Sequence, residues 1–110
     1  MKELFYDYKS EYGKRKLAPY ACKYSSNERL AIELMTKDGE PWSTLTVNLP
    51  GTSDLLDDDC AYIDTNNCSG AMDYIEKNKL GEVLPIVGFS GFCTYPCVRF
   101  DLSKLNKMPE

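Results

Sequence analysis

The segment Arg29–Pro50, which reads RLAIELMTKDGEPWSTLTVNLP, constrains the fold more than any other part of the chain. Two runs of alternating residues flank Asp38-Gly39. An Asp-Gly pair between such runs is the strongest short-range signal for a β-hairpin, because a type I′ turn needs positive φ at both central residues. The pattern therefore predicts two antiparallel strands over 29–36 and 42–49.

A two-residue turn at Asp38-Gly39 also predicts the register of this hairpin. The expected pairs are Lys37 with Glu40, Met35 with Trp42, Glu33 with Thr44, Ala31 with Thr46, Leu30 with Val47, and Ile32 with Leu45. Both strands then agree on one apolar face, to which Leu49 also belongs. A slip of one residue would move every side chain to the opposite face, so the agreement favours this register.

The composition is typical of one soluble domain covering residues 1–110. A chain of 110 residues with 43% hydrophobic and 12% aromatic residues can bury a core and differs from a disordered segment. No apolar run approaches the roughly 18 residues that span a bilayer. Residues 1–16 contain acids throughout and no continuous apolar stretch, unlike a signal peptide. We therefore expect a cytoplasmic protein without membrane contact.

The segments before the hairpin predict one further strand and leave another element open. Residues 4–9 alternate weakly, which indicates an edge strand or a short helix, and residues 10–16 are polar and indicate a loop. Residues 18–24 alternate as a strand, and Pro19 restricts that strand to an edge or places its start nearby. With the hairpin, this gives three antiparallel strands in succession.

The segments after the hairpin predict a loop, a strand and a helix. Residues 54–59 are expected to form an acidic loop or one helical turn anchored by Leu55 and Leu56, followed by a strand over 60–64. A helix over 70–80 is predicted from apolar residues at 3.6-residue spacing. The residues expected to delimit this helix are Asn67 or Ser69 as the N-cap and Gly81 just past the end.

The last third of the chain returns to extended structure. An apolar cluster at 83–87 is interrupted by Pro85, residues 88–92 indicate a turn or a bulge, and residues 98–102 alternate as a last strand. The tail, 103–110, is polar and expected to fray. The whole pattern predicts an α+β fold, in which an antiparallel sheet of about five to six strands carries one main α-helix on one face.

The chain lacks histidine and contains an odd number of cysteines, which limits its chemistry. Without histidine, Ser-His-Asp catalysis, Cys-His catalysis and His-containing zinc sites are excluded. The cysteines are Cys22, Cys60, Cys68, Cys93 and Cys97. With no secretion signal we expect reduced thiols, and their spacing differs from that of zinc ribbons. We therefore expect no metal, no cofactor and no catalytic residue.

Three short motifs carry a resemblance to a known family. They are Leu45-Thr46-Val47-Asn48-Leu49-Pro50, then Asp64-Thr65-Asn66-Asn67, then Gly88-x-Ser90-Gly91-Phe92-Cys93-x-Tyr95-Pro96 with Phe100. In this order and spacing the chain resembles the domain-of-unknown-function family 4313 over roughly residues 30–102, with residues 1–28 outside the motifs. The resemblance implies a small protein carried on conjugative and other mobile genetic elements, and it brings no catalytic residue or cofactor.

Acidic residues are concentrated in the middle of the chain. Residues 38–76 contain nine acids and no Lys or Arg, whereas residues 1–37 and 77–110 carry net charges of +3 and +2. One interpretation is a solvated surface whose acids favour the start of the helix. The other is a negative patch that meets a basic surface on a protein partner. Direct binding of nucleic acid is not expected, since this block repels phosphate.

Three other features have both a functional and a structural interpretation. Asp57, Asp58 and Asp59 offer ligands for Mg²⁺ or Ca²⁺, but the EF-hand spacing, glycine and final glutamate are missing. Cys93 lies in a glycine-rich segment, but no histidine can activate it, which favours a structural thiol. Trp42 on the less apolar hairpin face could serve as an exposed contact, unless the helix covers that face.

Two classes of function fit these features. The first is a non-enzymatic inhibitor of a host defence system, with an anti-CRISPR protein that blocks a Cas nuclease as the leading candidate. The second is a small metal-dependent enzyme or nuclease accessory that uses Asp57–Asp59. An adaptor of the element's transfer machinery is a third, plainer alternative. The residues expected to bind the partner are Asp54, Asp57, Asp58, Asp59, Asp64, Asp38, Glu40 and Trp42. Both a monomer and a homodimer fit the sequence.

Overall fold

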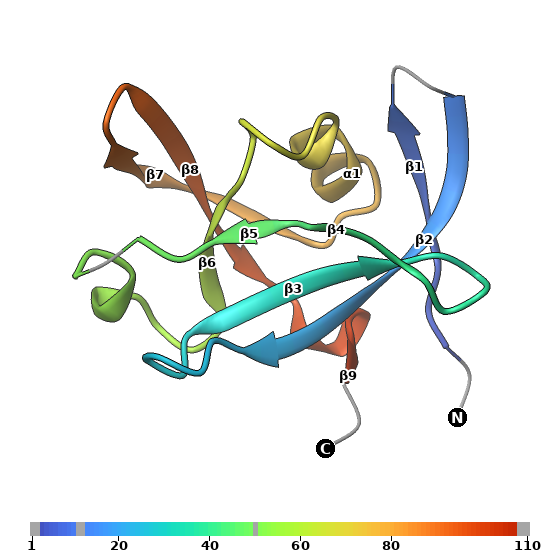
Figure 1. The fold of residues 1–110 in the computed structure, drawn as a ribbon, viewed down its shortest axis with the longest axis horizontal. Coiled ribbons are helices and arrows are strands. Elements are labelled where there is room, and N and C mark those ends of the chain that lie inside the picture. The colour runs from blue at the N-terminus through green and yellow to red at the C-terminus, as the bar shows by residue number, and fades with distance from the viewer. Residues whose placement is uncertain (1–2, 11–12, 50, 108–110) are drawn as a thin grey trace.

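The fold is built mainly from β-strands (Figure 1). A computed structural model describes residues 3–10, 13–49 and 51–107. The strands are β1 (Tyr6–Ser10), β2 (Gly13–Lys23), β3 (Leu30–Met35), β4 (Pro41–Thr44), β5 (Thr46–Val47), β6 (Cys60–Ile63), β7 (Gly81–Ser90), β8 (Cys93–Phe100) and β9 (Asn106–Lys107). The helices are the α-helix α1 (Ala71–Lys77) and the 3₁₀ helices η1 (Ser53–Leu55) and η2 (Leu102–Lys104).

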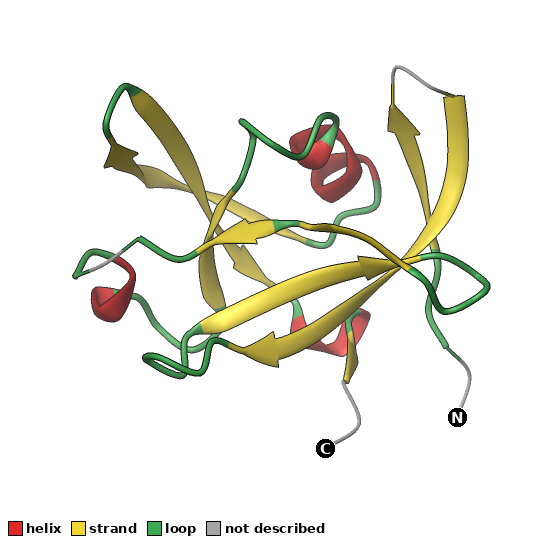
Figure 2. Ribbon diagram, viewed as in Figure 1, coloured by secondary structure: helices red, strands yellow, loops and turns green. Residues whose placement is uncertain are grey.

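The strands form two sheets, so the expected α+β fold of one sheet with one main helix is wrong. Strands make up about half of the described residues, and helices about an eighth (Figure 2). The first sheet has the order β1-β2-β3-β4, with β9 also paired to β2, and the second has the order β5-β6-β8-β7. The β2–β9 pair is parallel and the others are antiparallel.

The central hairpin is present, but its turn differs from the predicted one. The N–H of Thr36 donates to the carbonyl of Glu40 (2.9 Å), and the N–H of Gly39 donates to the carbonyl of Thr36 (3.0 Å). Gly39 has a φ of 82°, whereas Asp38 does not have a positive φ. These contacts define a three-residue loop with glycine in the left-handed position, so Met35 pairs with Pro41 instead of Trp42.

A β-bulge restores the predicted register further along the hairpin. The register shifts between Leu34 and Met35, and beyond this point Glu33 pairs with Thr44, as predicted. The bulge absorbs the one-residue offset that the longer loop introduces. Burial of the apolar face therefore outweighs the preference for a two-residue turn, because a slipped register would expose that face to water.

The second strand of the hairpin divides at Leu45 between the two sheets. Before this residue, β4 pairs with β3, and after it, β5 pairs with β6. The Leu45 N–H donates to the carbonyl of Ile32 (2.8 Å), and its own carbonyl accepts from the N–H of Asp64 (3.0 Å). Leu45 thus joins both sheets, and its side chain is fully buried with Ile32. Two predicted pairs are consequently wrong, Ala31 with Thr46 and Leu30 with Val47.

The main core lies between the two sheets and α1. Its buried residues come from β1, β2, β3, β6, β8, α1 and the adjoining segments; among them are Tyr8, Leu17, Ile32, Leu34, Leu45, Ile63, Tyr74, Ile75, Leu80, Val98 and Phe100. The Tyr74 hydroxyl donates to the carbonyl of Leu17 at 2.9 Å, which satisfies its buried polar group. The helix therefore completes a core that the strands mostly supply.

The helix is shorter than predicted and begins differently. It spans Ala71–Lys77 instead of 70–80, and its N-cap is Gly70, without a side-chain cap from Asn67 or Ser69. Gly70 has a φ of 82°, and a Cβ there would lie 2.5 Å from the carbonyl oxygen of Lys9. Gly81, expected to end the helix, instead begins β7. Within the described residues, no helix is long and apolar enough to cross a membrane.

Both ends of the chain contain more strand than predicted. Residues 6–10 form β1, which decides between the two expected alternatives, and β2 already begins at Gly13, where a loop was expected. Most of the expected frayed tail is ordered: β9 pairs with β2 at Tyr20 and Ala21, and Leu105 is buried. Residues 108–110 of that tail lie outside the described part.

Candidate functional site: the acidic loop

The acidic loop, defined as residues 54–59, lies beside a small second core on the outer face of the second sheet. This core consists of Leu49, Cys60, Tyr62, Tyr95 and Cys97. It is distinct from the main core because neighbouring residues of a strand point to opposite faces of a sheet. Leu56 packs against it and is partly buried. The loop is therefore held against the sheet by apolar contact.

Hydrogen bonds stabilise both the acidic loop and the segment that precedes it. The Leu49 N–H donates to Oγ of Ser53 (2.8 Å), and the Ser53 N–H returns a bond to the Leu49 carbonyl (2.8 Å). Nδ2 of Asn27 donates to Asp54 (2.6 Å) and to Asn48 (3.0 Å). The loop is thereby connected to the turn between β2 and β3, which lies next to it although it is distant in sequence.

Two arginines bind the carboxylates at the end of the loop. Arg29 donates to the Leu56 carbonyl through Nη1 (2.6 Å) and pairs with Asp58 through Nη2 (3.0 Å). Arg99 on β8 pairs with Asp57 through Nη2 (2.9 Å) and with Asp59 through Nη1 (2.6 Å). Ion pairs at a surface contribute only about 0–1 kcal/mol each, but they orient the side chains that they join.

The contacts between Arg99 and Asp59 shift the pKa values of both groups. Partial burial raises the pKa of Asp59, but hydrogen bonds from Arg99 and Cys60 outweigh that effect and keep the pKa below its ordinary value. Hydrogen bonds to Asp57 and Asp59 raise the pKa of Arg99. Arg99 and Asp59 therefore remain charged at neutral pH, and the ion pair persists.

Leu55, the last residue of η1, is exposed. Its exposed fraction is 85%, so the expectation that it anchors the loop is wrong, whereas Leu56 is partly buried, as that expectation requires. An exposed apolar side chain on an acidic loop that hydrogen bonds and ion pairs hold in place resembles a protein contact site, in which an apolar anchor lies among polar residues.

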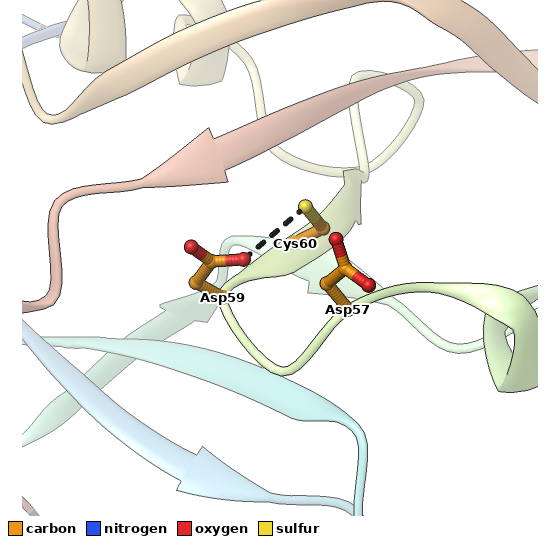
Figure 3. A group of neighbouring side chains, drawn as sticks. All are labelled: Asp57, Asp59 and Cys60. Carbon is orange, nitrogen blue, oxygen red and sulfur yellow. Dashed lines mark hydrogen bonds between the residues drawn. The ribbon is translucent and has the colours of Figure 1, made fainter.

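Asp57, Asp59 and Cys60 form the only group of potential metal ligands found among the described residues (Figure 3). Their ligand atoms lie within 4.8 Å of one another. The guanidinium of Arg99 already binds both carboxylates. Burial and the neighbouring Asp59 raise the pKa of the Cys60 thiol to about 11, which disfavours the thiolate that a metal needs. The cluster therefore fits an internal ion-pair network better than a metal centre.

The structure separates the eight residues predicted to bind a partner. Asp38 and Glu40 are exposed in the β3–β4 loop, at the opposite end of the molecule from η1 (Figure 1). Trp42 is half-buried, with Arg15 4.0 Å from its ring centroid. Asp64 is half-buried and accepts bonds from the backbone and side chain of Asn67. Only the predicted residues Asp54, Asp57, Asp58 and Asp59 lie together, in the acidic loop.

The sequence interpretation missed Leu55 as an exposed anchor and both arginines that organise the loop. Arg29 and Arg99 are 70 positions apart; Arg29 lies just before β3 of the first sheet, and Arg99 lies on β8 of the second. No local pattern connects them to the loop. The five cysteines are free thiols, and Cys93 is half-buried on β8 with Tyr95 as a hydrogen-bonding neighbour.

Comparison with known proteins places the chain in a family. A family model described as "Domain of unknown function (DUF4313)" matches residues 20–110, and the chain belongs to this family. The match extends beyond the region of the three motifs, because it includes β9 and part of β2. No curated protein and no solved structure matches the chain.

Proposed function

We propose that this protein acts without catalysis, by binding another protein through its acidic loop. The observation that carries this proposal is the exposed Leu55 on a loop that two arginines and Asn27 hold in place. A loop already ordered before binding loses less conformational entropy in a complex, so more of its contact energy appears as affinity. Leu55 would supply the apolar anchor.

The partner is proposed to carry a basic surface. Asp54, Asp57, Asp58 and Asp59 outnumber Arg29 and Arg99 in this region, so the loop retains a negative charge. Complementary charges raise the association rate and orient the encounter. Arg29 and Arg99 partly cancel the negative electrostatic field of the loop. Asp54 and Asp58 should contribute most to the remaining field. Asp54 has a neutral hydrogen-bond partner, and the Asp58 side chain is 86% exposed.

For the identity of the partner we propose an effector nuclease of a CRISPR defence system in the cytoplasm. Support comes from the association with mobile genetic elements that the family resemblance implies, and from the acidity of the loop. Such nucleases hold guide and target in positively charged channels. A small acidic protein that occupies a channel of this kind would exclude the nucleic acid.

The test is a nuclease cleavage assay with purified protein, guide and target. Two variants change the loop, Asp54→Asn with Asp58→Asn, and Leu55→Ser. The double variant should slow association by about tenfold at low salt and reduce the salt dependence of inhibition. Leu55→Ser should accelerate dissociation, because it removes the apolar contact of Leu55 and leaves the charge of the loop unchanged.

The matched control is Asp38→Asn with Glu40→Gln, which removes the same charge at the opposite end of the molecule. This control should inhibit as the wild type does. Equal inhibition by the control and both loop variants at every salt concentration would contradict a role for the acidic loop. Failure of the wild type to inhibit any tested effector would contradict the nuclease assignment and favour a partner in the transfer machinery.

A further inference from the structure

The β7–β8 hairpin contains the longest stretch of the chain without a charged residue. This stretch is 83–98, between Glu82 and Arg99. The hairpin projects away from the first sheet (Figure 1). Several of its large apolar side chains are exposed, namely Val83, Ile86, Val87, Phe89 and Phe92. A surface of this kind usually marks an interaction site.

β7 is an edge strand whose outer half is regular. It lies at the end of the second sheet, and no strand in the described part of the chain pairs with its other side. The register shift between Val83 and Val87 places a bulge around Pro85. A proline and a bulge protect the first half of the edge against pairing, but the half from Val87 to Ser90 lacks such protection.

The register with β8 shows which face the apolar side chains of this half occupy. Val87 lies opposite Pro96 and Phe89 opposite Thr94, and residues directly opposite one another share a face. Thr94 and Pro96 point to the same face of β8 as Val98, whose side chain belongs to the main core. Val87 and Phe89 therefore extend the inner apolar face beyond the core, with exposed fractions of 47% and 69%.

The same register shows which backbone groups point to the free edge. Gly91 and Phe92 form a two-residue turn, which closes on a hydrogen-bonded pair, here Ser90 and Cys93. Hydrogen-bonded and non-hydrogen-bonded pairs alternate in an antiparallel ladder. Val87 and Phe89 then occupy the non-hydrogen-bonded positions, which agrees with a proline opposite Val87. Their N–H and C=O groups point outward.

We propose that β7 pairs antiparallel with β7 of a second copy of this chain, centred on Gly88. Val87 of one copy would lie opposite Phe89 of the other, and each such pair would exchange both N–H···O bonds. The contact would be isologous, since the same residues contribute from both copies. The two second sheets would then form one continuous sheet with a shared apolar inner face.

A second copy fits this edge because the edge is complementary to itself. The sequence Val87-Gly88-Phe89 places glycine at the two-fold axis, in the non-hydrogen-bonded pair where the Cα atoms approach most closely. Val87 beside Phe89 is a favourable β-branched–aromatic pair. Antiparallel pairing also places the two Glu82 side chains at opposite ends, so the only charge on β7 does not repel its copy.

This proposal is tested by measuring the oligomeric state of the full chain over a wide concentration range, by sedimentation velocity and by light scattering. The wild type should change from monomer to dimer as concentration rises. Phe89→Lys should weaken dimerisation by at least about tenfold, because each of the two copies would then place one charge in the shared apolar face. Leu102→Lys is the matched control, an exposed residue on η2, and should dimerise as the wild type does.

A second variant tests the backbone contact without adding charge. Val87→Pro removes an outward N–H that β8 does not use, so the hairpin should remain folded while pairing is lost. Hydrogen exchange should show protected amides at Val87 and Phe89 in the wild-type dimer and exposed ones in Phe89→Lys. A wild type that is monomeric at every concentration would overturn the proposal. The edge of β7 would then be a candidate for pairing with a strand of a different protein. A dimer that persists in both variants would overturn it as well.

Discussion

Replacing Leu45 by alanine is the most direct test of the two-sheet architecture. Leu45 lies where the chain passes from one sheet to the other, and its backbone bonds to Ile32 on one side and Asp64 on the other. Its side chain is fully buried in the main core. If this residue joins the two sheets, the cavity left by Leu45→Ala should weaken the packing of both.

The expected loss follows from the buried volume that is removed. The substitution removes three carbon atoms, and at about 0.8 kcal/mol per buried methylene the transfer contribution is about 2.4 kcal/mol. The residual cavity adds to this, so the total loss in the free energy of unfolding should be about 3–5 kcal/mol. For a domain of this size, about 4 °C of melting temperature corresponds to each kcal/mol. We therefore expect a decrease of about 12–20 °C.

The measurement is urea unfolding followed by circular dichroism, with thermal unfolding as a second readout. The matched control is Leu55→Ala, the same chemical change at a side chain that is 85% exposed. Its effect on the free energy of unfolding should stay within about 0.5 kcal/mol. The slope of the free energy against urea should be the same in all three proteins, since each exposes nearly the same surface on unfolding.

Two results would refute this reasoning. A loss below about 1 kcal/mol for Leu45→Ala would mean that Leu45 does not occupy the core between the sheets. A loss for Leu55→Ala as large as the loss of about 3–5 kcal/mol expected for Leu45→Ala would mean that Leu55 is buried. The second result would also remove the apolar anchor on which the proposed function depends.

Two further predictions concern Arg99 and the glycine at the start of β7. Because Arg99 keeps the pKa of Asp59 below its unfolded value, its stabilising contribution is present at neutral pH and is lost as pH falls through the folded pKa, below about pH 4. The stability difference between wild type and Arg99→Gln should therefore shrink on acidification in urea titrations, and a difference that stays constant down to pH 2 would contradict the ion pair. Gly81→Ala should cost about 1–3 kcal/mol, because a Cβ there would lie 2.5 Å from the carbonyl oxygen of Arg99 and 2.7 Å from Cγ1 of Val98; an unchanged melting temperature would show that β7 and β8 are less closely packed at this point.

The alternation in the central hairpin was enough to predict part of its burial, although Val47 and Leu49, expected on the same face, belong to the second core instead, and Ala31 and Thr46 on the other face are also buried. The alternation over 29–36 and 42–49 predicted that Ile32 and Leu45 share one apolar face, and both lie in the main core. Such alternation can be recognised in a sequence because successive side chains of a strand point to opposite faces of the sheet. The family was also recognisable from the sequence, since short motifs at fixed spacing carry it.

The candidate site was only partly predictable. The run of acids at 54–59 is visible in the sequence, and these residues do lie together in one loop. The exposure of Leu55 was not predictable, because a leucine beside another leucine carries no local sign of which one is buried. The pairing of Asp57 and Asp59 with Arg99 depends on β8 lying beside β6, where Arg99 is opposite Cys60, and no local pattern records this pairing.

The distribution of the strands between the two sheets depends on contacts between residues distant in sequence. Residues on both sides of Leu45 have the same extended, alternating character, yet β4 pairs with β3 and β5 pairs with β6. The loop at Gly39 and the bulge after Leu34 were likewise decided by packing, because together they keep the apolar face buried. Local preference among turns amounts to a small free energy, whereas burial of a whole strand face is much larger and depends on partners distant in sequence.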